Sequence, residues 1–249
     1  MLNVTDLGEG TPILWVHGFP LASSVYEHQL ALRRVRHVMP DLPGFGQSRA
    51  AFGELTMDGY ARAMVEELDH RGIDRAVVAG LSMGGYIAFA MARLAPERLR
   101  ALILIDTRET ADTPEAKKGR YDSIEKVRKE GIGPVVESML PKMLTENAPQ
   151  EMKDRVREIM SSSSPDGVIA ALRAMAERPD SSAVLPKIAV PTLVVVGEED
   201  KITPPADAER MAAATPKARL VRIPDAAHLS NYEQAEAFNK AVGLFVASV

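Results

Sequence analysis

The stretch VAGLSMGGYIAF, residues 78–89, places a serine, Ser82, among glycines at positions 80, 84 and 85. An apolar run precedes the serine, and the apolar spacing of a helix follows it. Glycine loses more backbone entropy on folding than other residues, so glycines concentrated around one serine indicate a conformation that side chains would obstruct. A strand ending at Gly80 and a helix starting near Met83 would form a sharp, strained turn with Ser82 at its tip.

Such a turn at the carboxyl edge of a parallel sheet is a nucleophile elbow, which exposes the serine hydroxyl to a substrate. Side chains at Gly80 and Gly84 would collide with the neighbouring helix and strand, so these glycines are a steric requirement of the elbow. The alternative is an ordinary strand-to-helix turn, because the pattern Gly-x-Ser-x-Gly also arises by chance. Its place between a buried strand and an apolar-faced helix favours the elbow.

Short apolar runs predict strands along most of the chain, and several lack strict alternation, as in a parallel sheet covered on both faces. Helix-like segments, such as residues 57–71 and 84–94, lie between many of these runs. This alternation predicts an α/β fold with a doubly wound, mostly parallel sheet. The predicted strands cover residues 13–18, 35–41, 75–80, 101–106, 192–197 and 218–223.

The alternation stops between residues 107 and 184, where no strand pattern occurs. This segment predicts four helices and is interpreted as a helical cap inserted into a core made of residues 1–106 and 185–249. Prolines lie near the starts of three of these helices, as is usual for the first helical turn. Pro141 is expected to kink the second helix. The predicted cap helices cover residues 113–129, 133–145, 149–161 and 165–177.

Composition limits the function classes that the chain could serve. It has 249 residues, 46% hydrophobic and 26% charged, with a net charge of −4 and no cysteine. We therefore expect a globular protein with no disulfide or thiolate chemistry and no nucleic-acid or membrane partner. The first residues resemble no signal peptide and no apolar run is long enough to cross a bilayer, so a cytoplasmic location is expected.

A serine hydroxyl needs a base to accept its proton. In a chain with an elbow the expected order is serine, acid, histidine. Of the five histidines, only His228 follows both the serine and the last predicted strand. The acid should follow a strand between them, which favours Asp200, three residues after a strand-ending glycine. Asp106, at the end of another predicted strand, is the alternative acid, and Asp200 could instead cap a helix.

Two backbone N–H groups would complete the site as an oxyanion hole. One belongs to Met83, which follows the serine, and the other to Phe19 in the turn HGFP, residues 17–20. His17 in that turn is expected to be structural. No group of His, Asp and Glu has metal-ligand spacing, and this chemistry needs no metal and no cofactor.

Five motifs, in this order, resemble those of the α/β-hydrolase superfamily, and in particular small bacterial carboxylesterases and 3-oxoadipate enol-lactonase-like hydrolases. The resemblance implies the same triad of Ser82, Asp200 and His228 and a cap over the site. It also implies a two-strand hairpin before the HGFP strand, where only LNVTDLG is present, so we expect one edge strand to be missing. The motifs are WVHGFP (15–20), DLPGFGQS (41–48), GLSMGG (80–85), GEEDKITP (197–204) and AAHLSNYEQAEAFN (226–239).

The expected function is hydrolysis of small carboxylic esters through an acyl-enzyme on Ser82. A lactonase or a perhydrolase could use the same residues, and a non-catalytic ligand receptor on this scaffold is the alternative of a different class. The cap segment holds 13 Lys and Arg against 14 Asp and Glu, a net charge of −1. This balance predicts no cationic funnel for a dianionic lactone. The expected partner is a small ester or lactone, and the oligomeric state stays open.

Overall fold

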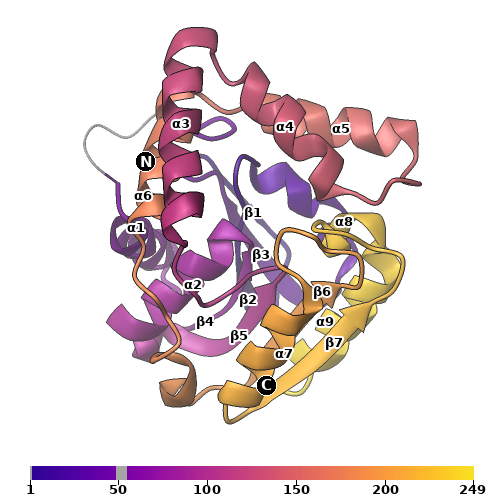
Figure 1. The fold of residues 1–249 in the computed structure, drawn as a ribbon. Coiled ribbons are helices and arrows are strands. Elements are labelled where there is room, and N and C mark those ends of the chain that lie inside the picture. The colour runs from indigo at the N-terminus through magenta and orange to yellow at the C-terminus, as the bar shows by residue number, and fades with distance from the viewer. Residues whose placement is uncertain (1, 49–54) are drawn as a thin grey trace.

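The computed structural model describes residues 2–48 and 55–249 and contains one seven-stranded sheet in the order β1-β3-β2-β4-β5-β6-β7. All neighbouring strands pair in parallel except β1 and β3. Helices flank the sheet, which confirms the predicted doubly wound α/β fold (Figure 1). The strands are β1 (Val4–Leu7), β2 (Thr11–Val16), β3 (Val35–Pro40), β4 (Ala76–Leu81), β5 (Leu99–Ile105), β6 (Thr192–Gly197) and β7 (Ala218–Ile223).

Strand β1 comes from the segment LNVTDLG, which the sequence analysis did not list as a strand. It runs antiparallel to β3 at the edge of the sheet, with Val4 opposite Pro40. Within the described residues, β1 is the one strand before β2. The described sheet therefore has one strand fewer at this edge than the family resemblance implies.

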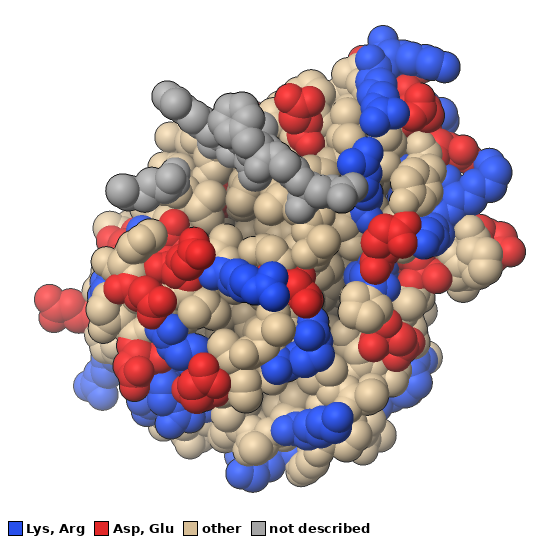
Figure 2. Space-filling model, turned by 90° about the vertical axis from the view of Figure 1, so that its left-hand side faces the viewer, with Lys and Arg blue, Asp and Glu red and all other residues tan. Residues whose placement is uncertain are grey.

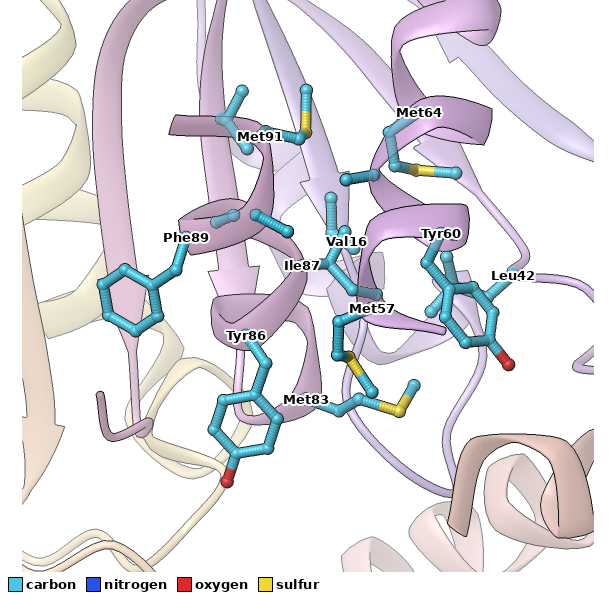
Figure 3. Packing of buried hydrophobic residues seen from close by; sticks show 14 of the residues in the cluster. Val16, Leu42, Met57, Tyr60, Met64, Met83, Tyr86, Ile87, Phe89 and Met91 are labelled. Atoms are coloured by element: carbon cyan, nitrogen blue, oxygen red, sulfur yellow. The ribbon is translucent and has the colours of Figure 1, made fainter. Parts of the chain in front are cut away.

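Two apolar clusters cover opposite faces of the sheet. Alternate residues of each inner strand divide between them; on β4, for example, Val78 packs in one cluster and Val77 in the other. Helices α1 and α2 cover the first face, where Met83 of α2 lies beside Met57 of α1 (Figure 3). The helices outside the 107–184 segment are η1 (Ser23–Ala31), α1 (Met57–His70), α2 (Met83–Leu94), η2 (Pro96–Arg98), η3 (Leu185–Lys187), α7 (Pro205–Ala214), α8 (Ser230–Glu233) and α9 (Ala235–Val246).

Between β5 and β6 the chain forms four helices, in agreement with the prediction within three residues at each end. In Figure 1 they run along one side and the top of the view, with α3 beside α6 and α4 beside α5. Their apolar faces join the two core clusters, through Val168 on one face of the sheet and Met143 on the other. Helix α4 continues for two residues past Pro141 and then ends. The four are α3 (Pro114–Glu130), α4 (Gly133–Met143), α5 (Gln150–Ser161) and α6 (Pro165–Ala176).

Charged side chains of both signs are interspersed on the face shown in Figure 2, without a broad field of one sign. Such a field is the usual mark of a surface that binds nucleic acid. No helix within residues 2–48 and 55–249 is long and apolar enough to span a membrane.

Candidate active site

Ser82 occupies the expected strained turn between β4 and α2. Its φ is 53° and its ψ is −112°, a region that residues with a side chain rarely adopt. Two hydrogen bonds hold the turn: the Ser82 N–H donates to the Ile105 carbonyl at 2.9 Å, and the Thr107 hydroxyl donates to the Ser82 carbonyl at 2.7 Å. The turn therefore depends on the neighbouring strand β5 as well as on its own residues.

The glycines on either side of Ser82 allow β4, α2 and β2 to approach closely. A Cβ built on Gly80 would lie 2.3 Å from the Gly84 carbonyl oxygen. A Cβ on Gly84 would lie 2.0 Å from the Val16 carbonyl oxygen of the neighbouring strand. Both distances involve backbone atoms and are far below van der Waals contact, so neither position accepts a side chain in this geometry.

The structure brings Ser82, His228 and Asp200 together in one line of hydrogen bonds. The Ser82 Oγ lies 2.9 Å from the His228 Nε2, and the His228 Nδ1 lies 2.8 Å from the Asp200 Oδ2. When Asp200 is ionised, Nδ1 must carry the proton, which leaves Nε2 free to accept from the serine. The His228 side chain is only 1% exposed and Ser82 keeps 9%, so little water competes for these hydrogen bonds.

Electrostatics favour an ion pair between the two buried partners. Burial has the largest single influence on the His228 pKa and lowers it, but the charge and hydrogen bond of Asp200, with the charge of Asp106, outweigh burial and raise it. Burial likewise acts to raise the Asp200 pKa, yet the charge and hydrogen bond of His228 and the hydrogen bonds from Thr203 lower it. An imidazolium at position 228 is thus stabilised when it forms.

Asp106, the alternative acid, makes no hydrogen bond to His228 in the described structure. One of its oxygens accepts from the Gly197 N–H at 2.8 Å, and the other accepts from the Ser230 hydroxyl at 2.6 Å. Burial and, after it, the charge of Asp200 raise the Asp106 pKa to about 8. Asp106 therefore links the ends of β5 and β6 to the loop of His228, whereas Asp200 contacts the imidazole itself.

The HGFP turn lies directly against Ser82. A Cβ built on Gly18 would be 3.1 Å from the Ser82 Cβ. His17 is fully buried and accepts from the Leu42 N–H at Nε2, so its Nδ1 carries the proton and donates to the Gly18 carbonyl at 2.9 Å. Burial lowers the pKa of His17, which favours this neutral tautomer. Its two hydrogen bonds hold the turn to Leu42, the structural role that we expected from the sequence.

The two predicted oxyanion donors are both at this junction. Met83 is the first residue of α2, where an N–H has no partner within its own helix. The Phe19 N–H makes no hydrogen bond to another backbone group in the described part of the chain. Both residues have buried side chains. Backbone N–H groups beside a serine hydroxyl can stabilise a negatively charged oxygen, and Phe19 and Met83 remain the predicted donors.

Two positioning groups of the site, Thr203 and Glu233, could not be found from the sequence. The Thr203 hydroxyl donates to the Asp200 Oδ2 at 2.6 Å. The Glu233 carboxylate accepts from the Ala227 N–H and from the Thr145 N–H, each at 2.7 Å. Glu233 thus connects the residue before His228 to the turn between α4 and α5. The motif quoted around His228 contains Glu233, but nothing in its spacing indicated a partner 88 residues away in the chain.

The helical segment 107–184 lies over the same edge of the sheet. The Ser163 hydroxyl donates to the Pro20 carbonyl at 3.2 Å, and the Ser164 N–H donates to the Gly44 carbonyl at 2.9 Å. At the other end, the Leu229 N–H donates to the Met143 carbonyl at 3.0 Å. These contacts join the segment to the HGFP turn and to the residue after His228.

The arrangement contains a hydroxyl, a base with an oriented tautomer, a buried carboxylate and two N–H donors. Those are the groups needed for acyl transfer to a serine. No group of three or more His, Cys, Asp and Glu side chains that could hold a metal occurs in the part of the chain that the structure describes.

Comparisons with a protein family and with known proteins match this chain over most of its length. The family model described as alpha/beta hydrolase fold matches residues 11–235. A thermophilic esterase from Thermogutta terrifontis, in a malate-bound structure, superposes with a TM-score of 0.97 at 42% identity and covers 99% of this chain and 93% of its own. The 3-oxoadipate enol-lactonase 2 of Acinetobacter baylyi is 28% identical over 225 residues, 88% of this chain and 82% of that protein.

A third relative is longer than this chain. The dihydrolipoyllysine-residue acetyltransferase component of the acetoin cleaving system of Pseudomonas putida is 30% identical over 251 residues. The match covers 95% of this chain and 64% of that protein, so the chain spans about two thirds of its length. The family model matches most of the chain, and the sheet and the strained serine turn described above agree with that match. This chain therefore belongs to the alpha/beta hydrolase fold family.

Proposed function

We propose that the protein is a serine hydrolase of small carboxylic esters, with Ser82 as nucleophile, His228 as base and Asp200 as the acid that orients it. The observation that carries this proposal is the continuous hydrogen bonding from the Ser82 Oγ through the imidazole to Asp200, at 2.9 and 2.8 Å. The names of the Thermogutta esterase and the Acinetobacter enol-lactonase support ester or lactone substrates.

In the proposed first half-reaction, the Ser82 Oγ attacks the ester carbonyl while its proton passes to the His228 Nε2. The carbonyl oxygen takes the negative charge and accepts hydrogen bonds from the Phe19 and Met83 N–H groups. His228 then gives its proton to the leaving alkoxide, which departs as the alcohol and leaves an ester on Ser82. Asp200 stabilises the imidazolium throughout without itself taking the proton.

In the second half-reaction water replaces the alcohol. His228 takes a proton from the water as the water oxygen attacks the acyl carbon. The tetrahedral intermediate then collapses, the imidazolium returns the proton to the Ser82 Oγ, and the carboxylic acid is released. A lactone would follow the same steps, with the alcohol remaining attached to the acyl group. Comparing kcat/KM for esters and lactones of equal carbon number distinguishes an esterase from a lactonase.

The covering helices lead us to expect a preference for short acyl chains. Roofed pockets are usually largely apolar and limited in volume, and by similarity to small esterases we expect acyl groups of about two to six carbons. The test is a series of p-nitrophenyl esters from C2 to C16, with the first turnovers followed rapidly. We expect a burst of p-nitrophenol, then steady turnover, and the highest kcat/KM at about C4. A larger kcat/KM for the C16 ester would contradict a restrictive cap, and a burst without turnover would favour a receptor.

The rate should depend on the protonation of His228. Because only the neutral imidazole accepts a proton and its pKa is raised, kcat/KM for p-nitrophenyl acetate should increase with pH, with a midpoint above about 6.5, and then level off. In Asp200→Asn the charge that raises this pKa is lost while burial still lowers it, so the midpoint should move to lower pH. An identical midpoint in the two proteins, measured from pH 5 to 9, would argue against an Asp200–His228 pair.

A further inference from the structure

The loop that carries His228 is tied to the helical segment on both sides of the histidine. The Leu229 N–H, one residue after it, donates to the Met143 carbonyl at 3.0 Å. The Ala227 N–H, one residue before it, donates to the Glu233 carboxylate at 2.7 Å. The N–H and carbonyl of His228 make no hydrogen bond within the described residues, so the place of its backbone follows from that of its two neighbours.

Glu233 connects the residue before the histidine to the turn that follows α4. Its Oε1 accepts from the Thr145 N–H and from the Thr145 hydroxyl, each at 2.7 Å, while its Oε2 accepts from the Ala227 N–H. One half-buried carboxylate thus takes three hydrogen bonds, two of them from the helical segment. Hydrogen bonds to a carboxylate are stronger than those between neutral groups, so Glu233 is a strong link between the two loops.

The core of the protein holds the same loop at a greater distance along the chain. The Glu199 N–H donates to the Ala226 carbonyl at 2.9 Å, and the Ser230 N–H donates to Asp106 at 3.2 Å. These two contacts lie two residues before and two residues after the histidine. The hydrogen bonds at the residues adjacent to it lead instead to the end of α4 and the turn after it.

We propose that Glu233 and Thr145 are positioning residues for the general base. Through them the helical segment sets the place of the imidazole between Ser82 and Asp200. This inference rests on the proposed ester hydrolysis and gives the segment a role beyond limiting the size of the substrate. A general base must lie within hydrogen-bond reach of the proton that it takes, and a displacement of about 1 Å can lower a rate about 100-fold.

The test is steady-state hydrolysis of p-nitrophenyl acetate by Glu233→Gln and Thr145→Val. The glutamine is nearly isosteric, but its NH₂ group replaces an oxygen that accepts a hydrogen bond. We expect kcat to fall about 10- to 100-fold in Glu233→Gln. In Thr145→Val, which loses only the hydroxyl, it should fall about two- to tenfold. KM should stay nearly unchanged in both, and Thr145→Ser, which keeps a hydroxyl, should retain the wild-type kcat.

The double variant Thr145→Val/Glu233→Gln tests whether the Thr145 hydroxyl acts through the carboxylate. Either orientation of the glutamine amide interrupts the connection between Thr145 and Ala227, so the double variant should be no slower than Glu233→Gln alone. Losses that multiply would show two independent effects and refute the link. The proton NMR resonance of the His228 Nδ1–H reports its hydrogen bond to Asp200, at 2.8 Å, and should shift or broaden in both single variants.

Glu27→Gln is the matched control, because Glu27 also links the helical segment to the core. Its Oε2 accepts from Arg155 of α5 at 2.8 Å, and its Oε1 accepts from the Tyr232 hydroxyl. In the described structure it makes no hydrogen bond to Ala227 or Leu229. This variant should lower the melting temperature without changing kcat or the His228 resonance.

The outcomes separate positioning from a purely structural role. If Glu233→Gln lowers only the melting temperature, or raises KM at unchanged kcat, the positioning role is wrong. If Glu233→Gln does not fold, the comparison of Thr145→Val with Thr145→Ser decides by the same criteria. Equal hydrolysis by wild type and Ser82→Ala would instead refute the proposed function.

Discussion

Replacing Ser82 with alanine should lower kcat for p-nitrophenyl acetate by about 10³- to 10⁶-fold. The hydroxyl is the proposed nucleophile, and in the structure it is the group that hydrogen-bonds to the His228 Nε2 at 2.9 Å. Removing it leaves the oxyanion donors and the binding surface in place, so a small residual rate should remain. Steady-state kinetics and mass spectrometry after treatment with an organophosphonate measure the loss of rate and of covalent labelling.

A matched control is available in Ser248→Ala. The Ser248 hydroxyl donates to the Phe245 carbonyl near the end of α9 and, among the described residues, makes no hydrogen bond to Ser82, Asp200 or His228. This variant should keep full activity and labelling at Ser82. Equal turnover by Ser82→Ala and wild type, with unchanged thermal unfolding, would refute the serine mechanism.

Asp200→Asn should lower kcat by about 10⁴-fold while the protein remains folded. The asparagine amide would replace the carboxylate that accepts from the His228 Nδ1, and an N–H facing the ring would favour the tautomer with its proton on Nε2. In that tautomer the imidazole cannot accept the serine proton. The hydrogen bonds to the Ile202 and Thr203 N–H groups, at 2.7 and 3.0 Å, can still form with the amide oxygen, so the loop should keep its shape.

The comparison variant is Asp106→Asn, which replaces the other buried carboxyl group with an amide. Asp106 holds Gly197 and Ser230 rather than the imidazole. We therefore expect a smaller loss of kcat than in Asp200→Asn, together with a lower melting temperature. If Asp106→Asn were the more damaging to kcat in a folded protein, the acid would be Asp106 and the assignment of Asp200 would be wrong.

Much of the fold could be predicted because its signals are local. The buried strands are short apolar runs, and the helices have prolines or capping residues at their starts, as Thr113 and Ser164 show for α3 and α6. The elbow was predictable for the same reason, since a side chain at Gly80 or Gly84 would meet backbone atoms. β1 was not listed because four residues at a sheet edge, half of them exposed, have too little apolar pattern.

The sequence by itself determined the strands from β2 onward, the helices of residues 57–71, 84–94 and the 107–184 segment, the strained serine turn and the two candidate acids. Only the tertiary structure showed which of the two acids contacts the imidazole of His228. Asp106 and Asp200 follow neighbouring strands, and the loops that return over the sheet bring Asp200 to 2.8 Å from the imidazole while directing Asp106 to Ser230. The roles of Thr203 and Glu233 depend on the tertiary structure in the same way. Hydrogen bonds and charges depend on distances of a few ångströms between loops far apart in the chain, and no local spacing records those distances.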